Sequence, residues 1–120
     1  MVTINSRLIK ARSYVHYVAV LIILLVLTGC EPFVTIKSPQ DGETFEVGRA
    51  IQFSGSARTF WGGKITGDSL SWTSNIDGEI GKGEDVITSS LSAGTHIITL
   101  AATNSSGEIG TEALSILVRQ

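Results

Sequence analysis

The segment from Thr95 to Thr103 alternates more regularly than any other part of this 120-residue chain. In an extended strand its even-numbered positions share one face: His96, Ile98, Leu100 and Ala102. The odd-numbered positions would then share the opposite face. A side-chain period of two is typical of a half-buried β-strand and not of a helix, so the segment predicts a strand with one face in a core.

Shorter segments after Cys30 show the same pattern. Each is bounded by Gly, Pro, Asn, Asp or Ser, and no helix-length run with a 3.6-residue apolar period appears. Strands are expected at residues 33–36, 44–47, 51–55, 70–72, 86–88, 95–103 and 113–118. This spacing predicts an all-β fold, a single Ig-like antiparallel β-sandwich of about seven strands. Its expected core includes Phe53, Leu70, Trp72, Ile98, Leu100 and Ile116.

The first 29 residues differ in composition from the rest. They contain three Lys or Arg residues and no acid, and an apolar run covers Val18–Leu27. A basic front, an apolar core and small residues before a cut are typical of a secretory signal peptide. Ten helical residues cover about 15 Å, half of the hydrocarbon thickness of a bilayer. Counted from Tyr14 to Cys30 the segment reaches the lower limit of a span, so an uncleaved signal anchor remains an alternative.

The apolar run ends in Leu27-Thr28-Gly29-Cys30, which contains the only cysteine of the chain. This tetrapeptide resembles the lipobox of bacterial lipoproteins, Leu-x-Gly-Cys. The resemblance implies a diacylglyceryl group on the Cys30 sulfur, cleavage before Cys30 and acylation of the new amine. The expected organisation is a cleaved signal peptide over 1–29, a lipidated cysteine and short tether over 30–32, and an Ig-like or PKD-type (polycystic-kidney-disease-type) domain over 33–120.

The resemblance also predicts a location. The residue after the cysteine is Glu31 and not the aspartate that marks inner-membrane retention in some bacteria, which favours the outer membrane. From Cys30 onward the chain has six basic and eleven acidic residues, a net charge of −5. Phosphate binding needs clustered Lys and Arg, so a nucleic-acid partner is not expected. The expected partner is the membrane, reached through the lipid on Cys30, and another envelope or surface protein or a glycan is the second candidate partner.

The body of the chain resembles the bacterial Ig-like and PKD-type modules of surface proteins. The resemblance depends on Trp72 before a Gly/Asp-rich turn, on Gly94-Thr95-His96 at a corner, and on the Asn104–Gly107 hairpin turn. The turn after Trp72 departs from the PKD motif Trp-x-Phe-Gly-Asp-Gly, which favours the broader Ig-like group. Such modules serve as spacers, adhesive units and carbohydrate-proximal accessories.

Two residues are expected to be structural. Trp72 is interpreted as the core tryptophan between the sheets. His96 lies where relatives often have a tyrosine, whose ring packs at a corner and whose polar atom bonds to nearby backbone. His96 is the only histidine after the leader, and a lone histidine makes neither a catalytic triad nor a zinc site. No catalytic residue, metal or cofactor is therefore predicted, although the acidic positions between 75 and 85 leave weak calcium binding as an alternative to solvated turns.

Residues 58–68 are expected to form a polar, glycine-containing loop that carries Phe60 and Trp61. Exposed aromatic side chains in a loop often mark a contact site. The two rings could instead cap the open end of the sandwich. The sequence thus predicts a membrane-anchored envelope lipoprotein whose Ig-like domain is a non-catalytic binding or structural accessory module. The alternative function is a carbohydrate-binding module for envelope or extracellular glycans, with Trp61 as the stacking platform; an enzyme is the weakest hypothesis.

Overall fold

The computed structural model describes residues 30–120. The predicted signal peptide, with the lipobox residues Leu27, Thr28 and Gly29, lies outside this range. Residues 31–120 form one compact unit. Among the described residues no helix is long and apolar enough to cross a membrane.

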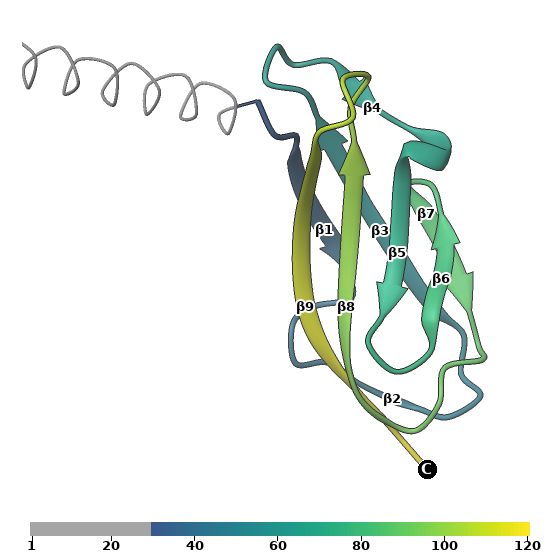
Figure 1. Cartoon of the computed structure of the whole chain (residues 1–120). Coiled ribbons are helices and arrows are strands. Elements are labelled where there is room, and N and C mark those ends of the chain that lie inside the picture. Colours follow the sequence, from purple (N-terminus) through teal and green to yellow (C-terminus); the bar gives the residue numbers. More distant parts are fainter. Residues whose placement is uncertain (1–29) are drawn as a thin grey trace, which may run out of the picture. The chain divides into compact units, whose positions relative to one another are not determined.

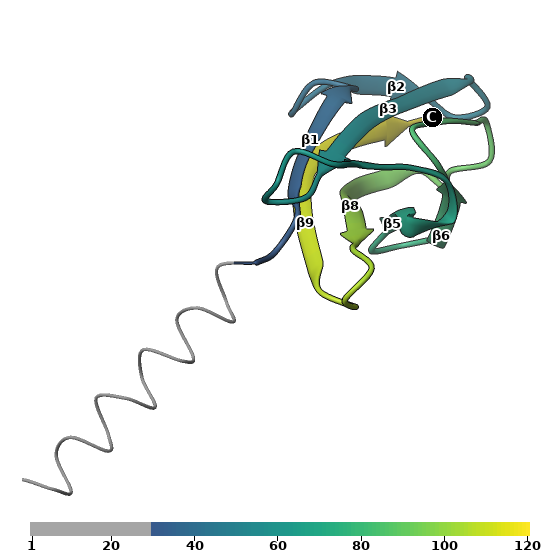
Figure 2. The ribbon, with the colours of Figure 1, turned by 90° about the horizontal axis from the view of Figure 1, so that it is seen from above.

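The compact unit is a sandwich of two β-sheets, seen from the front in Figure 1 and along its length in Figure 2. The first sheet is organised around β3, which pairs antiparallel with β1 on one side and with β4 and β7 on the other. Its strands are β1 (Phe33–Ser38), β3 (Ile51–Arg58), β4 (Lys64–Ile65) and β7 (Asp85–Thr88).

The second sheet has the strand order β2-β9-β8-β5-β6. Its strands are β2 (Thr44–Glu46), β5 (Leu70–Ser74), β6 (Gly78–Lys82), β8 (Gly94–Thr103) and β9 (Ile109–Arg119). A short 3₁₀ turn, η1 (Gly67–Ser69), precedes β5. The run β9-β8-β5-β6 corresponds to strands G, F, C and C′ of the Ig fold, and β1, β3 and β7 correspond to A, B and E.

The core lies between the sheets and contains the residues that alternation predicted. Trp72 and Phe53 are fully buried, with ring centroids 5.6 Å apart. Gly55 on β3 leaves room for this packing, because an added Cβ would lie 2.5 Å from Leu100 Cδ2 and 3.1 Å from Trp72 Cζ2. Ig domains commonly place a disulfide beside the strand-C tryptophan; here an aromatic ring, a glycine and a leucine fill that space.

The expected all-β sandwich is confirmed, with three differences in detail. The described residues contain nine strands instead of about seven. The two additional strands are β4, which has two residues, and β6, whose two glycines are typical of turns. The prediction of a loop over 58–68 is wrong for β4 and η1: Lys64 pairs with Arg58, and Ile65 is buried opposite Ala57. β2 lies at an edge as expected, but it pairs parallel with β9, a long-range pairing that local alternation does not specify.

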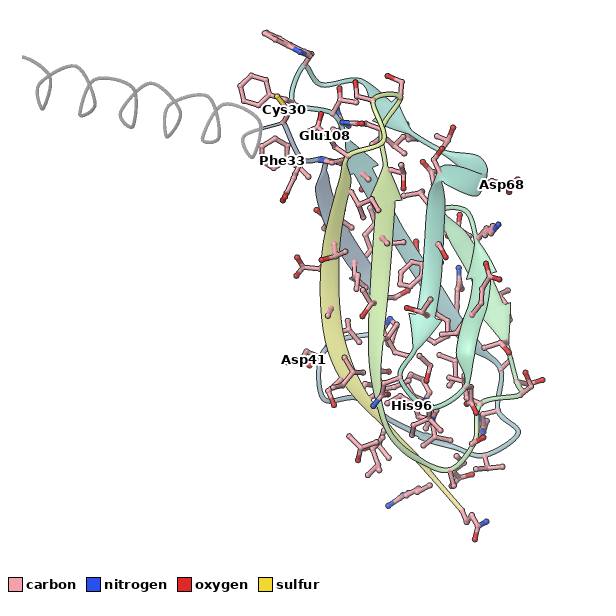
Figure 3. All side chains as sticks on the ribbon, viewed as in Figure 1. Cys30, Phe33, Asp41, Asp68, His96 and Glu108 are labelled. Atoms are coloured by element: carbon pink, nitrogen blue, oxygen red, sulfur yellow. The ribbon has the colours of Figure 1, made fainter. Side chains whose placement is uncertain are left out.

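The sandwich has two distinct ends, which Figure 3 marks with labelled residues. Phe33, the first residue of β1, and Glu108, in the turn before β9, lie at one end. We call this end the tether end, because the chain enters the sandwich there from Cys30. Asp41 and His96 lie toward the opposite end, which we call the far end.

Candidate functional site

The entry of the chain into the sandwich is fixed at Pro32. This proline is buried, and its backbone packs directly on Gly110 of β9, where any Cβ would collide with the Pro32 carbonyl group. Cys30 is exposed and two residues before Pro32. Consecutive Cα atoms are 3.8 Å apart, so the Cα atoms of Cys30 and Pro32 are at most about 7 Å apart. The predicted lipidation site therefore has almost no spacer between it and the sandwich.

The hairpin between β3 and β4 closes over five residues, 59–63, which we call the hairpin tip. The Gly62 N–H donates to the Thr59 carbonyl at 2.9 Å, and the Thr59 N–H donates to the Gly63 carbonyl at 2.7 Å. The Gly63 N–H also donates to Thr59 Oγ1 at 3.0 Å. Gly62 has a φ of 86°, a left-handed conformation that favours glycine. These bonds hold the tip in one defined conformation.

The hairpin tip displays two aromatic side chains. Trp61 is 89% exposed and Phe60 is 56% exposed. Their rings meet edge to face, with centroids 5.1 Å apart and planes at 90°. The sequence left open whether they cap the sandwich or face solvent, and the structure has them facing solvent.

Two more apolar side chains are exposed at the same end. Phe33 pairs with Arg58, the residue immediately before the hairpin tip, and Ile109 follows the turn next to Gly110. We call Phe33, Phe60, Trp61 and Ile109 the tether-end patch. The four residues come from both sheets and share one end of the sandwich.

A polar groove of about 400 Å³ lies beside the hairpin tip. Its lining residues are rich in hydroxyl groups: Thr59, Lys64, Ile65, Thr66, Ser69, Thr103, Asn104 and Ser105. Asn104 shapes one wall, because its Oδ1 accepts the N–H groups of Ser106 and Glu108, each at 3.0 Å. Lys64 Nζ lies 3.1 Å from Glu84 Oε1, so an adjacent carboxylate balances its charge.

The far end contains a buried polar cluster around His96. The side chain of His96 is fully buried, as is that of Trp72 in the core. His96 Nε2 lies 2.7 Å from the Ser92 carbonyl, and Nδ1 lies 2.7 Å from Ser74 Oγ. The ring bonds to backbone four residues upstream, as the tyrosine of an Ig-fold corner does. Trp72 Nε1 in turn donates to the Gly83 carbonyl at 2.9 Å. Both residues have the structural environment expected of core positions.

The hydrogen bonds assign the tautomer of His96. A carbonyl oxygen can only accept, so Nε2 carries the proton that is donated to Ser92. Ser74 Oγ accepts the N–H groups of Ile76 and Asp77, at 3.1 and 3.3 Å, which leaves its own O–H to donate to Nδ1. In this arrangement both ring nitrogens of His96 and the Ser74 hydroxyl have hydrogen-bond partners.

Asp77 extends this cluster to the surface. Its Oδ1 accepts the Ser92 O–H at 2.6 Å and its Oδ2 accepts the Ser92 N–H at 2.9 Å. These two bonds hold the pKa of Asp77 below its ordinary value. Asp77 therefore acts as a clamp between the β5–β6 turn and the β7–β8 corner.

A serine, a histidine and an aspartate thus meet, but their arrangement does not fit a catalytic triad. The imidazole Nε2 faces a carbonyl instead of a nucleophile, and Ser74 Oγ is buried and engaged by three partners. A triad needs an accessible nucleophile beside the base. Within residues 30–120, no three His, Cys, Asp or Glu side chains gather in a way that could hold a metal ion.

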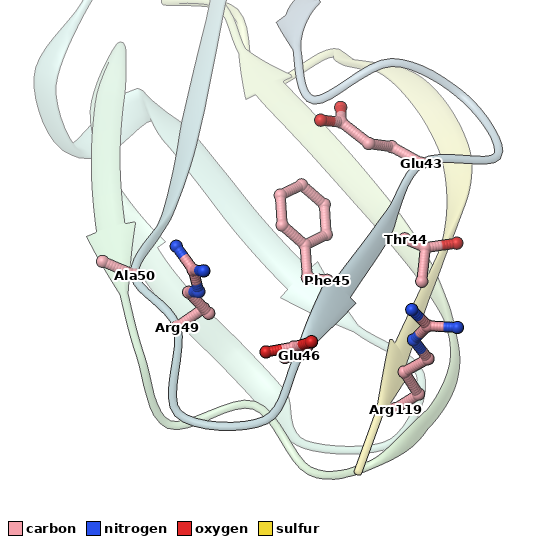
Figure 4. A pocket seen from close by; sticks show the side chains of 7 residues that line it. All are labelled: Glu43, Thr44, Phe45, Glu46, Arg49, Ala50 and Arg119. Atoms are coloured by element: carbon pink, nitrogen blue, oxygen red, sulfur yellow. The ribbon is translucent and has the colours of Figure 1, made fainter.

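A second surface cleft, of about 440 Å³, lies over β2. Figure 4 shows the ring of Phe45 in the middle of its lining, with two acidic and two basic side chains around it. The lining residues are Glu43, Thr44, Phe45, Glu46, Arg49, Ala50 and Arg119. Because the charges are mixed and the one aromatic ring also packs on the core, this cleft has no chemistry that selects a ligand class.

Sequence reasoning identified the aromatic residues and His96 but missed their partners. Ser74 follows the strand predicted at 70–72 and was not singled out, and Asp77 was predicted as a turn residue with weak calcium binding as the alternative. The contact between Pro32 and Gly110 was also missed. Gly110 lies inside β9 but before the strand predicted at 113–118, and a glycine inside a strand often marks a close approach of another backbone.

Comparison with protein-family models finds no match for this chain, and comparison with curated proteins finds none either. Solved structures do match. The fibronectin(III)-like modules of Clostridium thermocellum CbhA superpose with a TM-score of 0.57 and 24% identity, over 72% of this chain and 96% of theirs. Domains 4 and 5 of the S-layer protein SbsC give a TM-score of 0.47 and 20% identity, over 75% of this chain and 54% of theirs. The first similarity supports the Ig-like sandwich fold.

Proposed function

We propose that this protein is a lipid-anchored envelope protein, acylated at Cys30, whose Ig-like domain is a non-catalytic accessory module held against the membrane. The observation that carries the proposal is the fixed entry of the chain. Leu27-Thr28-Gly29-Cys30 resembles a lipobox, and Pro32, two residues later, is buried against Gly110. An acyl group on Cys30 would hold the sandwich at the bilayer without a flexible spacer.

The physics of lipid anchoring agrees with this role. One acyl chain gives only marginal attachment, whereas two or more chains hold a protein stably. A triacylated cysteine therefore needs no membrane-spanning helix. Glu31 after the cysteine favours the outer membrane. The non-catalytic role in this proposal is supported by Ser74 and His96, which are buried and hydrogen-bonded to each other.

Labelling of cells with a radioactive fatty acid tests the anchor. The wild-type protein should incorporate the label and migrate at the size of residues 30–120. The Cys30→Ser variant should incorporate none and migrate as the longer precursor, because cleavage of a lipoprotein leader requires the acylated cysteine. The chain has no other thiol, so this variant is a complete control. An unlabelled, full-length wild-type protein would contradict the proposal and favour the signal anchor.

Glycan binding is the second candidate function. A specific observation supports it: Trp61 is 89% exposed and stands beside a groove rich in hydroxyl groups. Sugar rings stack on aromatic faces, and hydroxyl and amide groups bond to their edges. Titration of the protein with peptidoglycan fragments and polysaccharides, followed by tryptophan fluorescence, tests this candidate. A saturable change that Trp61→Ala abolishes would support it, and no change with any glycan would exclude the glycans tested.

A further inference from the structure

We propose that the tether-end patch contacts the lipid interface, so that the hairpin tip forms a second membrane contact beside the acylated cysteine. This inference rests on the proposed acylation of Cys30 and assigns a ligand class, the headgroup and upper acyl region of a bilayer, to Phe60 and Trp61. The tip would then fix the orientation of the domain, which a lipid anchor alone leaves open.

The strand pairing brings the anchor and the tip together. β1 and β3 are antiparallel, and Phe33 pairs with Arg58 in the last register position of their ladder. Residues 30–32 continue beyond that position on one strand, and residues 59–61 continue beyond it on the other. Neighbouring strands are about 4.8 Å apart. The lipidation site and the aromatic tip therefore extend from the same end of the same strand pair.

The kind of side chain also differs between the two ends. The described residues include six aromatic side chains, and the three that are exposed, Phe33, Phe60 and Trp61, all belong to the tether-end patch. The exposed large apolar residues toward the far end are aliphatic: Val47, Ile76, Ile87, Ile97 and Leu117. Tryptophan in particular is enriched at membrane–water interfaces, because its ring is apolar and its N–H is polar.

The charged residues near the hairpin tip do not favour binding to anionic lipid, so the proposed contact depends on the apolar side chains. Arg58 is exposed beside it, but Lys64 is paired with Glu84, and Glu31, Asp68 and Glu108 lie at the same end. A polybasic patch for anionic lipid is therefore lacking in the described part of this end. Contact with the bilayer should depend on the aromatic rings and change little with salt concentration, unlike binding through basic residues.

Lipid-borne quenching of tryptophan fluorescence tests the inference directly. The acylated full protein is purified from membranes and placed in vesicles of phosphatidylethanolamine and phosphatidylglycerol that contain lipids brominated in the upper acyl chain. The chain has two tryptophans, and Trp72 is fully buried in the core. We expect the brominated lipids to quench the Trp61 part of the emission, aqueous acrylamide to reach it poorly, and the Trp61→Phe variant to lose this lipid quenching.

A double variant, Trp61→Phe with Ile97→Trp, provides the matched control. Ile97 is 51% exposed on β8, toward the far end. The relocated tryptophan should be quenched by acrylamide and not by the brominated lipids. Equal lipid quenching at both positions would mean that the domain lies without a preferred orientation, which overturns the inference.

The mass of the amino-terminal peptide of the same preparation separates the two proposals. With Cys30 acylated, a lack of lipid quenching at Trp61 overturns the lipid contact and leaves the anchor intact; a glycan-dependent change of Trp61 emission would then assign the tip to glycans. With Cys30 unmodified, the proposed function fails. In that case the tip contact is measured by mixing the protein with the vesicles, where quenching supports it and no quenching overturns it.

Discussion

The two ends of the sandwich use their polar and apolar groups in opposite ways. At the far end, His96 is fully buried and each of its ring nitrogens has a partner at 2.7 Å. At the tether end, Trp61 is 89% exposed on a hairpin whose hydrogen bonds are made by its backbone and Thr59. At the far end the buried polar residue therefore stabilises the fold. At the tether end the aromatic side chain is exposed to the surroundings.

The residues that stabilise the fold are therefore different from the residues that are available to contact a partner. Substitution of a buried, hydrogen-bonded group lowers the free energy of unfolding, because its partner is left unsatisfied. Groups that are exposed on a rigid turn contribute little to folding and can be exchanged without loss of structure. Four substitutions test the contrast, from the largest expected effect on unfolding to the smallest.

His96→Ala should have the largest effect, a loss of about 3 kcal/mol in the free energy of unfolding. It removes a buried ring and leaves the Ser92 carbonyl and the Ser74 hydroxyl without their partner. Urea denaturation measures the loss. Ile97→Ala, at the exposed neighbouring position, is the control and should cost much less. Equal losses at both positions would contradict the structural role of His96.

Gly110→Ala should cost about 2 kcal/mol, because the new Cβ collides with the Pro32 carbonyl and one of the two backbones must shift. The same change should release the tether, so that proteolysis near residues 30–33 becomes faster. Thr111→Ala, at the exposed next position on β9, is the matched control. Unchanged cleavage in Gly110→Ala would show that Pro32 does not hold the entry of the chain.

Asp77→Asn should change how stability depends on pH. The hydrogen bonds from Ser92 lower the folded-state pKa of Asp77 below its ordinary value of 3.8. A lowered pKa means that the stabilisation is complete above the ordinary value and is lost as the pH falls through it toward the lowered one. Wild type should therefore lose part of its stability in this acidic range. The variant, which has no carboxylate at this position, should lack that part; identical pH profiles would argue against the clamp.

Trp61→Ala should have the smallest effect on unfolding, within about 0.5 kcal/mol, because its side chain is almost fully exposed. Thermal unfolding measured by circular dichroism checks this. A loss as large as that of His96→Ala would show that the hairpin tip supports the core, and the contact role of the tether-end patch would then be wrong.

Local alternation predicted much of this architecture. The buried face of β8, with His96, Ile98, Leu100 and Ala102, was read correctly because a strand exposes its period of two in sequence. The parallel pairing of β2 with β9 was not predictable in the same way. It joins residues more than 70 positions apart, and alternation says which face is buried but not which strand lies next to it.

The candidate site shows the same limit. Two aromatic residues beside two glycines indicated a loop whose rings either cap the sandwich or face solvent. Their position at the same end as the predicted lipidation site depends on the register of β1 and β3. The Asp77–Ser92 bonds likewise connect two turns that are fifteen residues apart. Such contacts follow from the closed sandwich and have no signature in either turn alone.

We propose that Cys30 is the acylated first residue of the mature protein. The intact mass of the protein purified from its native membrane measures this most directly. The account predicts the mass of residues 30–120 plus a diacylglyceryl group and one further acyl chain. A mass equal to residues 1–120 with an unmodified cysteine would contradict it.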